Sequence, residues 1–198
     1  MEYKYLGKSY NRPDAISKVT GKAVYLDDVR LPGMLHAAIL RPEYAHAKIL
    51  SIDTSEAEKM PGVVKVVTGK GCPFRYGDNI RDLVPMAIDT VRYIGEPVAA
   101  VVADTPLHAR QAMEKIKVAY EPLPVYVDAR DAMKPDAVLI QPENGSFWHL
   151  PTLKPVPGTN IANVYRLVKG DGEDGFKDAE VVVEGDFLYP FGSCAAIE

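Results

Sequence analysis

Short apolar runs of strand length recur along the chain, and turn-forming residues separate them. Pro32-Gly33 and Pro61-Gly62 are the clearest turn signals, because proline and glycine interrupt regular structure. The runs that predict strands are Ala23–Leu26, Met34–Leu40, Lys48–Ile52, Val63–Val67, Val98–Ala103 and Val118–Tyr120. This pattern is typical of an α+β protein that is rich in strands.

One amphipathic helix is predicted directly after the run Val98–Ala103. Thr105 can cap it, Pro106 suits its first position, and apolar residues follow at i, i+3, i+4 and i+7 up to Ile116. The run before the helix does not alternate between apolar and polar residues, which favours a strand buried on both faces. Residues 95–120 therefore predict strand, helix and strand, with one face of the helix on a sheet.

Two shorter helices are expected elsewhere in the chain. Thr54 is an N-cap candidate for a two-turn helix, which the proline and glycine at 61–62 would end. Asp128 should cap a second short helix that runs through Met133 and ends before the next proline.

Periodicity disappears between residues 135 and 160, where five prolines predict an extended connector and not a packed element. We therefore expect a first domain over residues 1–134, a Pro-rich connector over 135–160 and an incomplete second domain over 161–198. In this last part, Asn163–Val168 and Glu180–Tyr189 predict two strands joined by an acidic loop and a helical turn. Two strands do not make a stable domain alone, so they should pair with another part of a protein.

The charges are interspersed along the chain, and their balance excludes one class of partner. The 198 residues include 23 Lys and Arg against 27 Asp and Glu, a net charge of −4. Nucleic-acid binding needs a basic stripe that neutralises phosphates, so no nucleic-acid partner is expected. The sequence shows neither a signal-peptide segment nor a long apolar stretch, and we expect a soluble, cytoplasmic protein without membrane contact.

The residue types that usually bind metals are few and scattered. Cys72 and Cys194 are the two cysteines, and the four histidines form no HxxxH or HExxH pair. This spacing supports neither a disulfide framework nor a zinc or iron–sulfur site. No metal-binding residue is assigned.

Three glycine-containing motifs match nucleotide loops only in part. Gly170–Gly175 fits GxGxxG, but its three carboxylates would stand where a pyrophosphate binds, and no long helix follows. Gly7-Lys8-Ser9 lacks the earlier glycine of a P-loop, and Thr68–Gly71 lacks the hydroxyl that binds magnesium. The acidic loop is expected to be a solvated turn, at most with a weak cation site, and no cofactor-binding residue is assigned.

Candidate nucleophiles lie near the end of the given sequence. Ser193 or Cys194 could act with a histidine, but neither lies in a GxSxG elbow. The sequence favours a small buried thiol over an activated one. His36 lies in an apolar run and is expected to be a core or interface residue. No catalytic residue is assigned.

Glu96 is the residue whose sequence surroundings are the most informative. It precedes Pro97 and an entirely apolar run. Its carboxylate should therefore be partly buried and held by backbone amides or by a cation such as Arg92. We expect its role to be structural and not catalytic.

Six segments in one order carry a resemblance to a known family. They are Arg12–Asp28, Leu31–His36, Arg41–Asp53, Pro61–Val64, Val91–Ala103 and Tyr120–Pro124. Together they resemble the opening of the large, molybdenum-carrying subunit of the aldehyde oxidase and xanthine dehydrogenase family.

The resemblance implies an α/β hammerhead domain of mixed sheet and few helices up to about Asp128, and the start of the first molybdopterin-binding domain from Asn163. In this family a molybdenum hydroxide attacks an electron-poor carbon, and electrons leave through iron–sulfur clusters to FAD. The glutamate base and the glycine-rich pterin loops lie downstream of the matched region, so they are assigned to no residue here.

The implied partners are the remainder of the molybdenum subunit and the domains or subunits that carry iron–sulfur clusters and FAD; the resemblance also allows a homo-oligomer. The molybdopterin-type cofactor belongs to the complete subunit, and none is expected in this chain alone. We therefore expect a scaffold and assembly role in an oxidoreductase, without catalysis by this chain on its own.

The last residues depart from the family's pattern. Similar members tend to read His-Ala-Pro-Met-Glu-Pro, whereas residues 194–198 read Cys-Ala-Ala-Ile-Glu, so that His, Pro and Met are replaced while Glu198 keeps its place. The alternative function is an independent small-ligand or protein-binding module that reuses the hammerhead fold. A third, a Cys/His hydrolase, would depend on Cys194.

Overall fold

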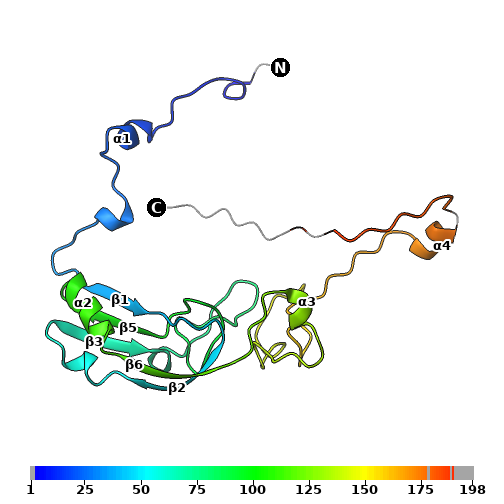
Figure 1. Ribbon diagram of the computed structural model, residues 1–198. Helices are drawn as coiled ribbons and strands as arrows, with labels where there is room; N and C mark the ends of the chain where they lie inside the picture. Colours follow the sequence, from blue (N-terminus) through cyan, green and yellow to red (C-terminus); the bar gives the residue numbers. More distant parts are fainter. Residues whose placement is uncertain (1–2, 178, 188, 190–198) are drawn as a thin grey trace. The chain divides into compact units, whose positions relative to one another are not determined.

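The computed structural model describes residues 3–177, 179–187 and 189. The chain divides into two compact units, of which one comprises Met1–Met34 with Val181–Glu198 and the other comprises Leu35–Glu180. All strands of the described residues lie in the second unit (Figure 1).

Two three-stranded antiparallel sheets make up the second unit. In chain order the strands are β1 His36–Leu40, β2 Ala47–Asp53, β3 Val63–Thr68, β4 Thr90–Val91, β5 Ala99–Ala103 and β6 Lys117–Pro122. The first sheet has the order β1-β5-β3 and the second the order β4-β2-β6. The predicted strands between residues 34 and 120 and the α+β class are confirmed.

The first sheet is built around β5, and the helix α2 (Pro106–Met113) packs against it. Thr105 caps this helix by accepting a hydrogen bond from the His108 amide at 3.2 Å, as its sequence predicts. Ala112 on α2 and Val101 on β5 are fully buried in one core cluster. These apolar contacts fix the helix on the sheet.

The burial of β5 corrects one expectation. Ala99, Val101 and Ala103 are buried, whereas the alternate residues Ala100 and Val102 are only partly buried. The strand is therefore buried fully on one face, because α2 covers that face and no second helix of the described residues packs on the other. An unbroken apolar run could not reveal this asymmetry.

The second sheet has its own small core of Ala87, Val91 and Val98. β2 is its central strand and pairs with β4 and β6, with an irregularity between Ile49 and Ser51. The strands on either side of α2, β5 and β6, belong to different sheets. The predicted strand-helix-strand segment thus connects the two sheets.

Two further predictions are wrong, the two-turn helix after Thr54 and the strand Ala23–Leu26. Residues 54–60 contain a single 3-10 turn, η2 (Ala57–Lys59), since the Thr54 hydroxyl bonds to the Glu58 carboxylate at 2.7 Å and caps no backbone amide. Ala23–Leu26 is not a strand. The chain there enters the 3-10 turn η1 (Leu26–Asp28). The Asp28 carboxylate stabilises this turn by accepting a hydrogen bond from the Tyr25 amide at 3.0 Å.

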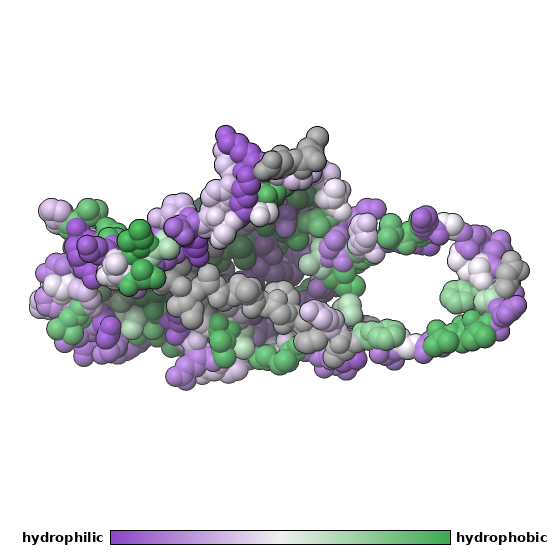
Figure 2. Space-filling model, turned by 90° about the horizontal axis from the view of Figure 1, so that it is seen from above, coloured by the Kyte–Doolittle hydropathy of each residue, from purple (hydrophilic) through white to green (hydrophobic). Residues whose placement is uncertain are grey.

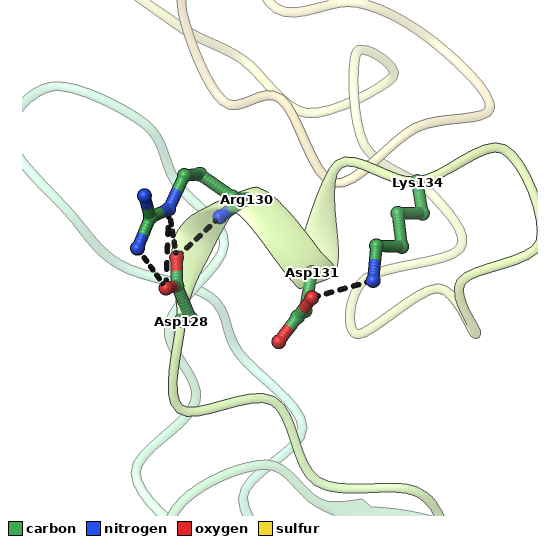
Figure 3. Close-up of polar contacts among 4 residues, drawn as sticks. All are labelled: Asp128, Arg130, Asp131 and Lys134. Atoms are coloured by element: carbon green, nitrogen blue, oxygen red, sulfur yellow. Dashed lines mark hydrogen bonds and ion pairs between the residues drawn. The ribbon is translucent and has the colours of Figure 1, made fainter.

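The remaining short elements are α1 (Ala15–Val19), the 3-10 turn η3 (Gly69–Gly71), α3 (Ala129–Ala132) and α4 (Gly172–Lys177). Figure 3 shows how α3 is stabilised. Asp128 accepts from the Arg130 amide at 2.8 Å and also binds the Arg130 guanidinium, while Lys134 pairs with Asp131 at 2.7 Å. The predicted cap at Asp128 is confirmed.

The Pro-rich connector contains no helix or named strand, but it is packed. Its backbone bonds to an earlier loop, with the Arg81 amide donating to the Trp148 carbonyl and the Leu150 amide to the Asn79 carbonyl, both at 2.9 Å. The Arg81 guanidinium also lies over the Trp148 ring, 4.5 Å from its centre. The expectation of an unpacked spacer is wrong here, while the domain limits at 134 and 160 stay predictions.

The last described part lacks the two predicted strands. Asn163–Val168 and the described residues of Glu180–Tyr189 are extended and exposed, and the helical turn between them is α4. A strand needs a neighbour along its length. The Val164 amide donates to the Lys154 carbonyl at 3.2 Å, but no ladder of such bonds forms among the described residues of these segments. No helix of the described residues is long and apolar enough to cross a membrane.

Candidate functional site

Segments from three of the sequence motifs meet at the start of β2. Ala47 pairs with Val91 on β4 and with Pro122 at the end of β6. Next to it, the His46 carbonyl accepts from the Leu123 amide at 3.0 Å. Residues 45–47, 91–98 and 120–124, far apart in sequence, thus form one junction.

The His46 side chain completes this junction. It is 5% exposed, and its Nδ1 lies 2.7 Å from the Pro124 carbonyl oxygen. Because a carbonyl oxygen can only accept, Nδ1 carries a proton and donates. His46 therefore holds the chain that leaves β6 with both its backbone and its ring.

Glu96 ends a tight turn within the junction, in which its amide donates to the Tyr93 carbonyl at 3.2 Å. It is 4% exposed, and its Oε2 accepts from the Arg92 amide at 2.6 Å. Gly95 in this turn has φ +79°, a conformation that side chains other than glycine rarely adopt, and its carbonyl accepts from the Arg41 guanidinium. The predicted burial of Glu96 and its hold by a backbone amide are confirmed.

Burial raises the pKa of Glu96 above its ordinary value, because water no longer solvates the carboxylate. The Arg92 amide and the Arg92 charge act in the opposite direction. The carboxylate thus organises the backbone of the turn, which is a structural role.

Arg92 links the same turn to the connector. Its guanidinium donates from Nε to the Ile140 carbonyl and from Nη1 to the Thr90 carbonyl, both at 3.0 Å. The Arg92 guanidinium thus donates to uncharged carbonyl oxygens, whereas Glu96 is bonded by the backbone amide of Arg92. Arg92 therefore ties β4, the turn and the connector together.

Two cavities open at this junction. One has a volume of about 300 Å³ and lies between the turn and residues 124–127, and the other has about 480 Å³ and lies over β2 and β4. His46, Arg92 and Ile140 line both. Cavities of these sizes fall in the range that holds small ligands in proteins.

The structure does not gather the scattered candidate residues into a second site. His36 is partly buried on β1, His108 lies on α2 and His149 in the connector. The described residues contain no group of three or more His, Cys, Asp and Glu that could hold a metal ion. Ser193, Cys194 and Glu198 lie outside the described residues.

The glycine motifs form no cradle for a nucleotide or a pterin. In the acidic loop, the Asp171 carboxylate accepts from the Glu173 amide at 3.0 Å and so caps α4. The loop carries three acids within Asp171–Asp174, which would repel the phosphate group of such a ligand. These residues do not fit a molybdopterin, and we assign no reaction step to them.

His46 is a residue of this site that the sequence did not indicate. It stands alone between two alanines, and its partner Pro124 lies 78 positions away. The available signal was that both residues fall within segments that resemble one family. The cavities left no signal, because they arise from packing between the junction and the connector.

Comparison with known proteins gives consistent matches. The family model for "Aldehyde oxidase and xanthine dehydrogenase, a/b hammerhead domain" matches residues 20–124. A probable xanthine dehydrogenase subunit of Bacillus subtilis is 38% identical over 181 residues, which cover 90% of this chain and 22% of that protein. Aldehyde oxidoreductase of Megalodesulfovibrio gigas is 37% identical over 198 residues, which cover 91% of this chain and 20% of that protein.

Solved structures agree with these sequence matches. Reconstituted CO dehydrogenase from Oligotropha carboxidovorans has a TM-score of 0.66 and 35% identity, over 78% of this chain and 20% of that chain. Aldehyde oxidoreductase from Desulfovibrio gigas has a TM-score of 0.62 and 38% identity, over 70% and 17%. The chain spans between 12% and 23% of the length of the first curated relatives it matches.

Proposed function

Since the chain belongs to the aldehyde oxidase and xanthine dehydrogenase family, we propose that it is the scaffold and assembly portion of a molybdenum hydroxylase large subunit. In this proposal residues 1–134 are the hammerhead domain, 135–160 the connector and 161–198 the start of a molybdopterin-binding domain. The chain supplies a folded platform, and the chemistry takes place on the remainder of the subunit.

One observation carries the proposal: large apolar side chains are exposed along the extended segments. Val183 is 87% exposed and Phe187 is 96% exposed, and Tyr165 and Leu167 are similarly uncovered. Figure 2 shows hydrophobic side chains on the surface of these segments. Apolar surface on this scale marks an interface, so these residues are expected to be covered by another part of an assembly.

The names of the relatives support the kind of partner. They include a probable subunit of xanthine dehydrogenase, a carbon monoxide dehydrogenase large chain and a nicotinate dehydrogenase large molybdopterin subunit. By analogy we propose that the partners are the rest of a molybdenum subunit, which binds the molybdopterin cofactor, and domains or subunits with iron–sulfur clusters and FAD.

A chimera tests the proposal. The region of the Bacillus subtilis xanthine dehydrogenase subunit that this chain matches is replaced by the chain, and the chimera is expressed with the other subunits of that enzyme. We expect a soluble chimera that assembles and binds molybdenum at a level close to that of the unaltered Bacillus protein. A chimera that folds but neither assembles nor binds molybdenum would contradict the proposal.

A further inference from the structure

The smaller cavity at the junction has an unusual charge distribution. Its described lining residues include one charged residue, Arg92, beside His46, two tyrosines and an apolar remainder. The larger cavity includes Lys48 as well as Arg92, and the carboxylates Asp89 and Glu143 balance these two positive charges. The smaller cavity is therefore the better place for an anion.

Arg92 has hydrogen-bonding capacity left over. A guanidinium carries five N–H donors, and two of them are used on the Ile140 and Thr90 carbonyls. Neither acceptor is charged, so both bonds leave the positive charge without a direct carboxylate partner. A planar group with two oxygens matches the geometry of the remaining donors.

His46 and Tyr126 add two more polar groups. With Nδ1 bound to Pro124, the Nε2 atom of this buried ring has no partner among the described residues. Tyr126 accepts from the Val138 amide at 2.8 Å, and its own O–H can still donate. Gln141 Oε1 is the one buried side-chain polar atom of the described residues that lacks a partner, so the Nε2 atom of His46 is open to water and can also meet a ligand.

The rest of the wall is apolar. Ile94, Pro124, Val125 and Val127 also line the cavity. Val127 is 99% and Ile94 70% exposed, so the cavity is open to solvent on this side, and its volume of about 300 Å³ suits a ligand of roughly ten non-hydrogen atoms. The Oε2 atom of Glu96 accepts from the Arg92 amide, and Glu96 is not among the residues that line the cavity.

We propose that this cavity binds a small apolar carboxylate, with its carboxyl group on Arg92 and Tyr126, next to His46, and its apolar body against Ile94 and Val125. This binding site is separate from the chemistry of the parent enzyme and does not depend on the proposed scaffold role. Its specificity lies in the anionic group, because the walls discriminate little among apolar shapes.

A titration followed by ¹H–¹⁵N NMR on the whole chain tests the site. The probe is benzoate, and benzyl alcohol is its neutral match in size and shape. We expect saturable shifts centred on the amides of Ala45, Arg92 and Tyr126, and an affinity for benzoate at least about tenfold higher than for the alcohol. Equal binding of both probes, or shifts that do not saturate, would overturn the proposal.

A pair of variants locates the binding. Val125→Trp should fill the cavity and weaken benzoate binding by about tenfold or more, and it leaves Arg92 in place. Leu107→Trp is the matched control, because Leu107 is exposed on α2, away from the cavity lining, and this variant should bind as the wild type does. Unchanged binding by the folded Val125→Trp variant would show that the ligand sits elsewhere and refute the site.

Discussion

At the scale of single residues, Glu96 combines a buried charge with an essential hydrogen bond. Its carboxylate accepts from the Arg92 amide at 2.6 Å, so Glu96→Ala should leave that amide without a partner and cost about 2 kcal/mol. Glu96→Gln keeps an oxygen at the same place and should cost less than about 1 kcal/mol at neutral pH. Urea unfolding measures both, and equal losses for the two variants would contradict this account.

The same residue predicts a pH dependence. Burial raises the pKa of folded Glu96, so between its ordinary pKa and this raised pKa the folded protein binds more protons than the unfolded chain. Its contribution to stability is therefore greatest below the ordinary pKa and falls as pH rises through the raised value. The stability of wild type relative to Glu96→Gln should decrease across that interval, and a difference that is flat with pH would refute the prediction.

Gly62 is required for both its conformation and its lack of a side chain. It has φ +76°, and a Cβ there would collide with the Asp104 carboxylate and the His108 ring, which are themselves paired at 2.6 Å. Gly62→Ala should cost about 2 kcal/mol or more. Gly95→Ala is the control, since its φ is similar but its Cβ would meet open space. Urea unfolding measures both variants. If Gly95→Ala lowers the free energy of unfolding as much as Gly62→Ala does, backbone strain alone explains the loss and the collision contributes nothing.

At the scale of elements, the two faces of β5 should differ in their contribution to stability. Val101 is fully buried against α2, whereas Val102, one position on, is partly buried. Val101→Ala should lower the free energy of unfolding by about 2–3 kcal/mol because it leaves a cavity in the core. Val102→Ala should lower the free energy of unfolding clearly less. If denaturant unfolding gives similar losses for the two variants, both faces of β5 are buried alike and this prediction is wrong.

The elements that could be predicted from the sequence are those that depend on local chemistry. Thr105 and Pro106 mark the start of α2, and Asp128 marks the start of α3, because a cap acts within one turn. Residues 54–60 misled the prediction because the Thr54 hydroxyl bonds to the Glu58 side chain. The predicted strands after residue 160 depend on neighbours, and a pattern in one segment does not tell which partner is present.

The junction was harder to predict than the elements that form it. Glu96 could be foreseen from the proline and the apolar run that follow it. The bond between His46 and Pro124 and the two cavities depend on segments far apart in the sequence, so nothing local indicates them. The resemblance to a family, now confirmed by the comparisons, marked the right segments but not their contacts.

At the scale of the molecule, the two sheets and the extended segments have opposite character. The unit Leu35–Glu180 contains the two sheets and both core clusters. The extended segments leave residues such as Val183 and Phe187 almost fully exposed. A scaffold needs a folded part and an exposed apolar surface that a partner can cover. We therefore expect the partner to bind the extended segments.

The most direct test is co-purification of the chain with the remainder of the Bacillus subtilis xanthine dehydrogenase subunit, beginning after the region that the chain matches. We expect a one-to-one complex that Phe187→Ser weakens at least about tenfold and that Leu107→Ser leaves intact. Both variants replace an exposed apolar side chain by serine. A difference in binding between them therefore reports where the side chain lies and not the loss of apolar surface in general. Elution of the folded chain alone, or equal binding by both variants, would contradict the central claim.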